Sequence, residues 1–157
     1  MNRYGTIKQR LTNNEWFEGE LTVSPDFRQV VFASNRAGDY DLFLADLDDF
    51  DHPRRITTTL GYESGVQFAP DGRSIAFRAW RPQSPDAQEF YRWLLSLDAA
   101  DVGRMDVYLL HLESGDERKI TDFSSLSGLP ELNNTWDEPN FAFAPNGDLY
   151  IRQAKQY

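Results

Sequence analysis

Three glutamates occupy the same position in three similar segments of the sequence. Glu18, Glu63 and Glu138 each stand seven residues before a proline. The three segments align without gaps and cover residues 13–25, 58–70 and 133–145. Carboxylates brought together in a ring could hold a hard cation such as calcium through oxygen ligands, or a cationic peptide. The alternative is that each glutamate makes a structural bond to the backbone of a neighbouring repeat.

Aromatic residues accompany these glutamates. Trp16, Tyr62 and Trp136 lie one or two residues away from them. Aromatic side chains next to polar groups are typical of protein-binding surfaces. Packing between repeats is the alternative role. If the glutamates converge on one axis, these aromatic residues should surround the same opening.

The segments that carry the glutamates are predicted to be strands. Apolar residues alternate with polar ones before each proline, which is the period of a half-buried strand. A turn of the Pro-Asp-Gly type follows, in which proline fixes φ and Gly or Asn tolerates positive φ. Second strands are predicted over 29–33, 74–78 and 148–152, third strands over 41–45 and 106–110, and fourth strands over 54–57 and 118–121, with 9–12 as a further fourth strand.

This unit has the size of one propeller blade, which contains four strands in about 40–45 residues. The first two turn prolines, Pro25 and Pro70, are 45 residues apart, and the third, Pro145, follows 75 residues later. The longer interval contains a predicted helical insertion at 80–104 and a loop insertion at 122–135. We expect one all-β domain over residues 1–157, a β-propeller of about three four-stranded antiparallel blades. A β-sandwich is the alternative.

The repeat resembles the TolB-type β-propeller repeat. The first copy matches with SPD at 24–26, VVFASNRAG at 30–38, DLFLADL at 41–47 and RIT at 55–57. The second copy matches with APDGRSIAF at 69–77, DVY at 106–108 and IT at 120–121. The third copy departs from the pattern with Asn146 in its turn and stops after its second strand.

The resemblance implies a ring of blades, typically six, in which the first strand of each blade lines a central channel. It also implies a role in protein complexes of the cell envelope. About three blades form a partial ring or half of a six-bladed ring, and an open arc exposes unpaired strand edges. We therefore expect a homodimer or a larger assembly that completes the ring.

The insertion at 80–104 is predicted to contain a helix. Ser84 offers an N-cap, and Asp86 with Glu89 resembles a capping box. Four apolar residues recur at helical spacing: Phe90, Trp93, Leu94 and Leu97. This helix either lies on the face of the propeller or docks onto a partner.

Two further features are expected to play no part in catalysis. The stretch 39–51 contains six aspartates and begins like a calcium loop, but Phe50 stands at a ligand position, so we expect a solvated loop. His52 and His111 are the only histidines, and the sequence has no G-x-S-x-G, H-E-x-x-H or P-loop motif. No catalytic residue and no cofactor are predicted, apart from calcium at the glutamates.

Composition excludes several classes of protein. The net charge of −9, from 16 basic and 25 acidic residues, disfavours binding to nucleic acid. There is no cysteine, and no apolar run approaches the roughly 20 residues of a membrane span. No signal peptide is visible, which favours the cytoplasm, or the periplasm if a leader was removed.

The sequence thus predicts a non-enzymatic scaffold that presents the channel mouth and the inserted helix to a protein partner. One alternative is a metal-dependent, lyase-like propeller enzyme that acts on polysaccharides. The other is a truncated propeller with a purely structural role.

Overall fold

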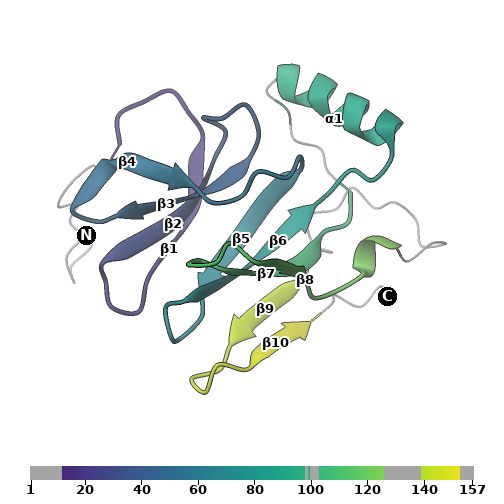
Figure 1. The fold of residues 1–157 in the computed structure, drawn as a ribbon. Coiled ribbons are helices and arrows are strands. Elements are labelled where there is room, and N and C mark those ends of the chain that lie inside the picture. Colours follow the sequence, from purple (N-terminus) through teal and green to yellow (C-terminus); the bar gives the residue numbers. More distant parts are fainter. Residues whose placement is uncertain (1–11, 98, 100–102, 126–138, 153–157) are drawn as a thin grey trace.

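Three antiparallel sheets stand side by side in the computed structural model, which describes residues 12–97, 99, 103–125 and 139–152 (Figure 1). Blade 1 pairs its strands in the order β1 (Glu18–Val23), β2 (Gln29–Ser34), β3 (Asp41–Asp46) and β4 (Asp49–Arg55). Blade 2 pairs β5 (Tyr62–Phe68), β6 (Ser74–Trp80), β7 (Asp106–His111) and β8 (Glu117–Lys119). The third sheet pairs β9 (Asn140–Phe143) with β10 (Leu149–Arg152). The predicted fold class, a partial propeller of four-stranded antiparallel blades, is confirmed.

The helix α1 (Pro85–Ser96) lies in the first insertion, at one end of the blades, and the hairpin turns of the repeat lie at the opposite end (Figure 1). A 3₁₀ turn, Phe123–Ser125, begins the second insertion, most of which falls outside the described residues. The same is true of most of the predicted strand at 9–12.

The fourth strands differ from the prediction. They end at Arg55 and Lys119, two residues before the threonines that were expected to close them. The Thr57 hydroxyl accepts the Leu42 amide at 2.8 Å, and the Thr121 hydroxyl accepts the Val107 amide at 2.9 Å. A side chain therefore takes the place of a backbone partner at the end of each ladder.

The aspartate-rich stretch is also more ordered than expected. It forms all of β3 and the start of β4, joined by a tight hairpin in which Asp46 pairs with Asp49. Asp39 and Asp41 are buried rather than solvated. Because β3 is a central strand of blade 1, residues at its start are covered from both sides.

The repeat is visible in backbone geometry as well as in strand order. The first strand of each complete blade contains a register shift, after Gly19 in β1 and after Ser64 in β5. Glu20 and Gly65 have the same left-handed φ, at 53° and 60°. A bulge of this kind bends the strand and favours glycine. Glu20 adopts this conformation although it is not a glycine, and its carboxylate accepts the Gly65 amide of the next blade.

The main core lies between the two complete blades. Alternate residues of β2 and β3 face β5, β6 and β7, and the most buried of them are fully inaccessible to solvent: Val31, Leu42, Ile75 and Phe77. Burying a side chain of this size contributes about 1.5–3 kcal/mol. The opposite face of blade 1 forms a smaller cluster in which Phe32 stacks on Phe43 and Phe50.

Candidate functional site

Glu18 and Glu63 each form an ion pair with an arginine of their own blade. Glu18 pairs with Arg36, and Glu63 pairs with Arg81. The two arginines stand at equivalent positions of the repeat, just after the second strand, and each follows its glutamate by 18 residues. Glu138 lies outside the described residues. The equal spacing of the glutamates therefore encodes a charge pair in both copies that the structure describes.

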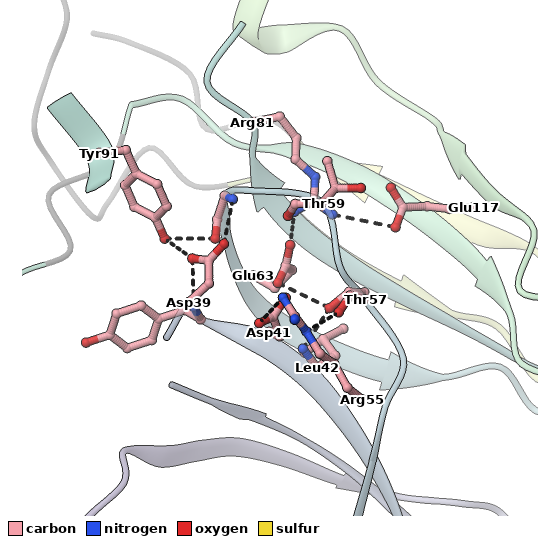
Figure 2. A network of polar contacts seen from close by, with 12 residues as sticks. Asp39, Asp41, Leu42, Arg55, Thr57, Thr59, Glu63, Arg81, Tyr91 and Glu117 are labelled. Carbon is pink, nitrogen blue, oxygen red and sulfur yellow. Dashed lines mark hydrogen bonds and ion pairs between the residues drawn. The ribbon is translucent and has the colours of Figure 1, made fainter. Parts of the chain in front are cut away.

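Glu63 joins blade 1 to blade 2. Its second carboxylate oxygen accepts the Thr57 hydroxyl at 3.2 Å, from the segment that leaves blade 1 (Figure 2). Arg81 also donates to the Thr59 carbonyl at 2.9 Å and lies 3.5 Å from Glu117. Glu63 is 1% exposed, so its carboxylate is not offered to a cation or peptide from solvent. The Glu63 carboxylate thus bonds side chains of its own blade and of the preceding one, whereas the structural alternative expected a bond to the backbone of a neighbouring repeat.

Glu18 is more accessible than Glu63. Burial acts to raise its pKa, but hydrogen bonds from Thr12, Asn14 and Arg36 outweigh this and hold the pKa below its ordinary value of 4.5. The Asn14 amide donates at 2.9 Å. Glu18 is therefore ionised at neutral pH and engaged by its own neighbours.

A second polar motif recurs at the end of each blade and was missed by the sequence analysis. In blade 1, Arg55 lies 2.7 Å from the fully buried Asp41. In blade 2, Lys119 lies 2.9 Å from Asp106, which also accepts the Thr121 hydroxyl at 2.9 Å. An aspartate at the start of the third strand and a basic residue at the end of the fourth recur in the sequence and could have revealed it.

Burial raises the pKa of Asp41, an effect that the Arg55 guanidinium partly opposes. The pair lies beside the Glu63 network, and together they form a polar layer between the blades (Figure 2). A buried pair of this kind fixes which groups face each other more than it stabilises the fold. The layer positions the loops at the α1 end of the molecule.

The helix α1 is anchored to both complete blades by one side chain. Tyr91 is fully buried, and its hydroxyl lies 2.7 Å from Asp39 of blade 1 and 2.8 Å from the Gly61 carbonyl, which precedes β5 (Figure 2). A hydroxyl has one proton, so it donates to one of the two oxygens at a time. The Trp80 ring packs edge-on against Tyr91 at 5.2 Å. Burial, together with the Asp39 charge, raises the pKa of Tyr91 and keeps it a neutral donor.

The predicted N-cap is confirmed, because the Ser84 hydroxyl accepts the Ala87 amide at 3.1 Å. Leu94 is 7% exposed and faces the blades with Tyr91, so it does not belong to an accessible surface. Phe90, Trp93 and Leu97 are each more than half exposed. They follow one another at helical spacing on the outer side, and the rings of Phe90 and Trp93 are 5.6 Å apart.

Aromatic residues of blade 1 lie at the same end of the molecule. Trp16 and Phe17 are exposed, and the Phe17 ring lies 5.5 Å from that of Tyr40. Tyr40 in turn lies 5.0 Å from Tyr62, the first residue of β5. Trp136 falls outside the described residues. We name as the aromatic face the following set: Trp16, Phe17, Tyr62, Phe90, Trp93 and Leu97.

In the part of the chain that the structure describes, no three His, Asp or Glu side chains are grouped so that they could hold a metal ion. His52 is exposed and lies 2.7 Å from Asp49, whose hydrogen bond raises the His52 pKa. No described helix is long and apolar enough to cross a membrane.

Comparison with known proteins identifies the fold. No protein-family model matches the sequence, and no curated protein matches it. Among solved structures, a putative TolB from Agrobacterium tumefaciens is similar, with 21% identity and a TM-score of 0.66 over 99% of this chain and 50% of that one. TolB from Acinetobacter baumannii has 18% identity and a TM-score of 0.58, over 87% of this chain and 26% of that one.

The tricorn protease is also similar, with 27% identity and a TM-score of 0.52, over 79% of this chain and 10% of that one. The chain thus spans half the length of the first of these proteins and about a quarter of the second. These likenesses show a TolB-like β-propeller fold.

Proposed function

We propose that the chain is a non-enzymatic protein-binding propeller module that docks onto a protein partner through its aromatic face, and mainly through α1. The observation that carries the proposal is the contrast between the two sides of this helix. One side is fixed to the blades by the buried Tyr91, and the other holds Phe90, Trp93 and Leu97 in water.

The exposed side has the composition of an interface centre. Tryptophan and other large aromatic residues dominate the binding energy of protein–protein contacts, because they bury much area at a small cost in side-chain entropy. The anchor adds to this effect. A helix that is already fixed in place loses little further conformational freedom when it binds.

The TolB-like fold supports this class of function without identifying the partner, because propellers carry many activities. The sequence resemblance implies a component of an envelope protein complex as the partner. Membership of the TolB repeat family and assembly into a full ring, with a second copy or a larger assembly, belong to the same proposal.

The test compares two sets of exposed aromatic residues. A variant with Phe90→Ser and Trp93→Ser removes the outer side of α1, while Tyr150→Ser removes an aromatic side chain, 64% exposed, on β10 of the third sheet. Both changes concern exposed side chains and should alter the free energy of unfolding by less than about 0.5 kcal/mol each.

A photo-crosslinking residue placed at position 97 identifies the bound protein in cells, and calorimetry with that purified protein measures the affinity. The proposal expects the double variant to bind at least tenfold more weakly and Tyr150→Ser to bind like the wild type. Equal affinity of all three chains would contradict it.

A further inference from the structure

The turns of the repeat lie side by side at the end of the blades opposite α1 (Figure 1). Each is closed by a backbone hydrogen bond of 2.8 Å, from Ser24 to Gln29, from Ala69 to Ser74, and from Ala144 to Asp148. The third turn is one residue shorter than the others. Two equivalent spaces therefore lie between the turns, one between the first and second turns and one between the second and third.

The space between the first and second turns is closed. A Cβ atom placed on Gly72 of the second turn would lie 3.5 Å from Pro25 of the first, which is ordinary contact. Leu44 and Phe68, the apolar residues beneath these turns, are both less than 10% exposed.

The equivalent space between the second and third turns is open. A Cβ atom placed on Gly147 would meet no described atom within 4 Å. Leu109 and Phe143, which correspond to Leu44 and Phe68, are only partly buried. A pocket of about 420 Å³ occupies this space. Its size falls within the range of pockets that bind small ligands or side chains.

The lining of the pocket is mostly apolar and contains one carboxylate, that of Asp71. Its residues are Ala69, Pro70, Asp71, Ser74, Leu109, Phe143, Pro145, Asn146 and Gly147. Among the described residues, no Lys or Arg belongs to this lining. The Asn146 side-chain amide donates to the Asp148 carboxylate and accepts the Asp148 backbone amide. Asp71 accepts the Arg73 amide at 2.9 Å through Oδ1 only, which leaves Oδ2 for a ligand.

We propose that this pocket binds an apolar side chain of a basic peptide segment. Leu109 and Phe143 receive the apolar group, and Asp71 attracts the flanking cation. The charge of the whole chain, −9, favours the approach of the same kind of segment. The site is separate from the aromatic face, because it lies at the other end of the blades (Figure 1).

The test uses three short peptides with the ¹⁵N-labelled chain and records amide chemical shifts. Acetyl-Lys-Phe-Lys-amide is the probe, acetyl-Glu-Phe-Glu-amide reverses the charge, and acetyl-Lys-Gly-Lys-amide removes the apolar group. The proposal expects only the first peptide to shift the Leu109, Phe143 and Gly147 amides in a saturable way. Binding of the acidic peptide with equal affinity, or no saturable shift at these amides up to millimolar concentration, would overturn it.

The repeat supplies a matched pair of variants. Asp71→Asn removes the charge but keeps an acceptor for the Arg73 amide, and Asp26→Asn makes the same change in the closed first turn, where Asp26 accepts the Arg28 amide at 3.1 Å. We expect Asp71→Asn to weaken binding roughly two- to fivefold, the usual effect of one exposed charge pair, and Asp26→Asn to have no effect. Equal effects of the two variants would show that the attraction is general and not made by this pocket.

Discussion

The anchor of α1 can be tested by removing a single hydroxyl group. Tyr91→Phe keeps the ring against Trp80 but takes away the only side-chain donor that the Asp39 carboxylate receives from α1. Asp39 is buried and retains the amides of Tyr40 and Gly61. The variant therefore weakens the solvation of a buried carboxylate without opening a large cavity.

The expected cost follows from the charge of the acceptor. A hydrogen bond to a charged group contributes about 1.5–3 kcal/mol. For a domain of this size, 1 kcal/mol changes the melting temperature by about 2–4 °C, so Tyr91→Phe should lower it by about 3–12 °C. The control is Tyr150→Phe, which removes an exposed hydroxyl and should change the melting temperature little.

Hydrogen exchange of the α1 amides separates a local effect from a global one. If Tyr91 anchors the helix, Tyr91→Phe should accelerate exchange in α1 more than in β2 and β6. A free energy of unfolding within about 0.5 kcal/mol of the wild type, together with unchanged exchange in α1, would refute the role given to Tyr91. A loss of partner binding without a change in unfolding free energy or in α1 exchange would not support the anchoring role of Tyr91.

Three other predictions follow from the charge pairs and from the assembly. Glu63→Gln should cost about 3–5 kcal/mol in urea unfolding because it leaves Arg81 without its buried partner, whereas Glu18→Gln at the more exposed pair should cost about 1 kcal/mol or less; equal costs would contradict the role of Glu63 in joining blade 1 to blade 2. Because folding lowers the pKa of Glu18, this residue adds stability at pH values above its ordinary pKa of 4.5, and that stability is lost as the pH falls through the lower pKa of the folded chain. Glu18→Gln should therefore flatten the acid side of the pH–stability profile, and an unchanged profile would refute this. Light scattering at micromolar concentration should give at least twice 18.1 kDa if copies complete a ring, and a stable monomer would exclude that assembly.

Much of the fold could be predicted from the sequence because the signals are local. Alternating apolar residues and a Pro-Asp-Gly turn depend on backbone geometry within a few residues, and they gave the second and third strands nearly to the residue. The Ser84 cap is local in the same sense. The fourth strands were misplaced because, at the end of each ladder, the Leu42 and Val107 amides donate to the Thr57 and Thr121 hydroxyls and not to backbone carbonyls.

The roles of the site residues could not be predicted in this way. The repeat spacing marked Glu18 and Glu63 correctly as equivalent, but spacing does not say whether a carboxylate faces solvent or an arginine. The equal offsets of Arg36 and Arg81 were a usable signal that was not recognised. The charge pair thus recurs with the repeat, but many other charged residues of the sequence make it hard to recognise from spacing alone.

The sequence by itself determined the repeat, the blade and the helix, since each depends on neighbours along the chain. Only the tertiary structure decided that Tyr91 faces inward and that Phe90 and Trp93 remain in water. Helical spacing places an apolar stripe on α1 but does not choose which part of it meets the blades. That choice depends on Asp39, 52 residues away, whose buried carboxylate needs a donor that only the packed helix brings to it.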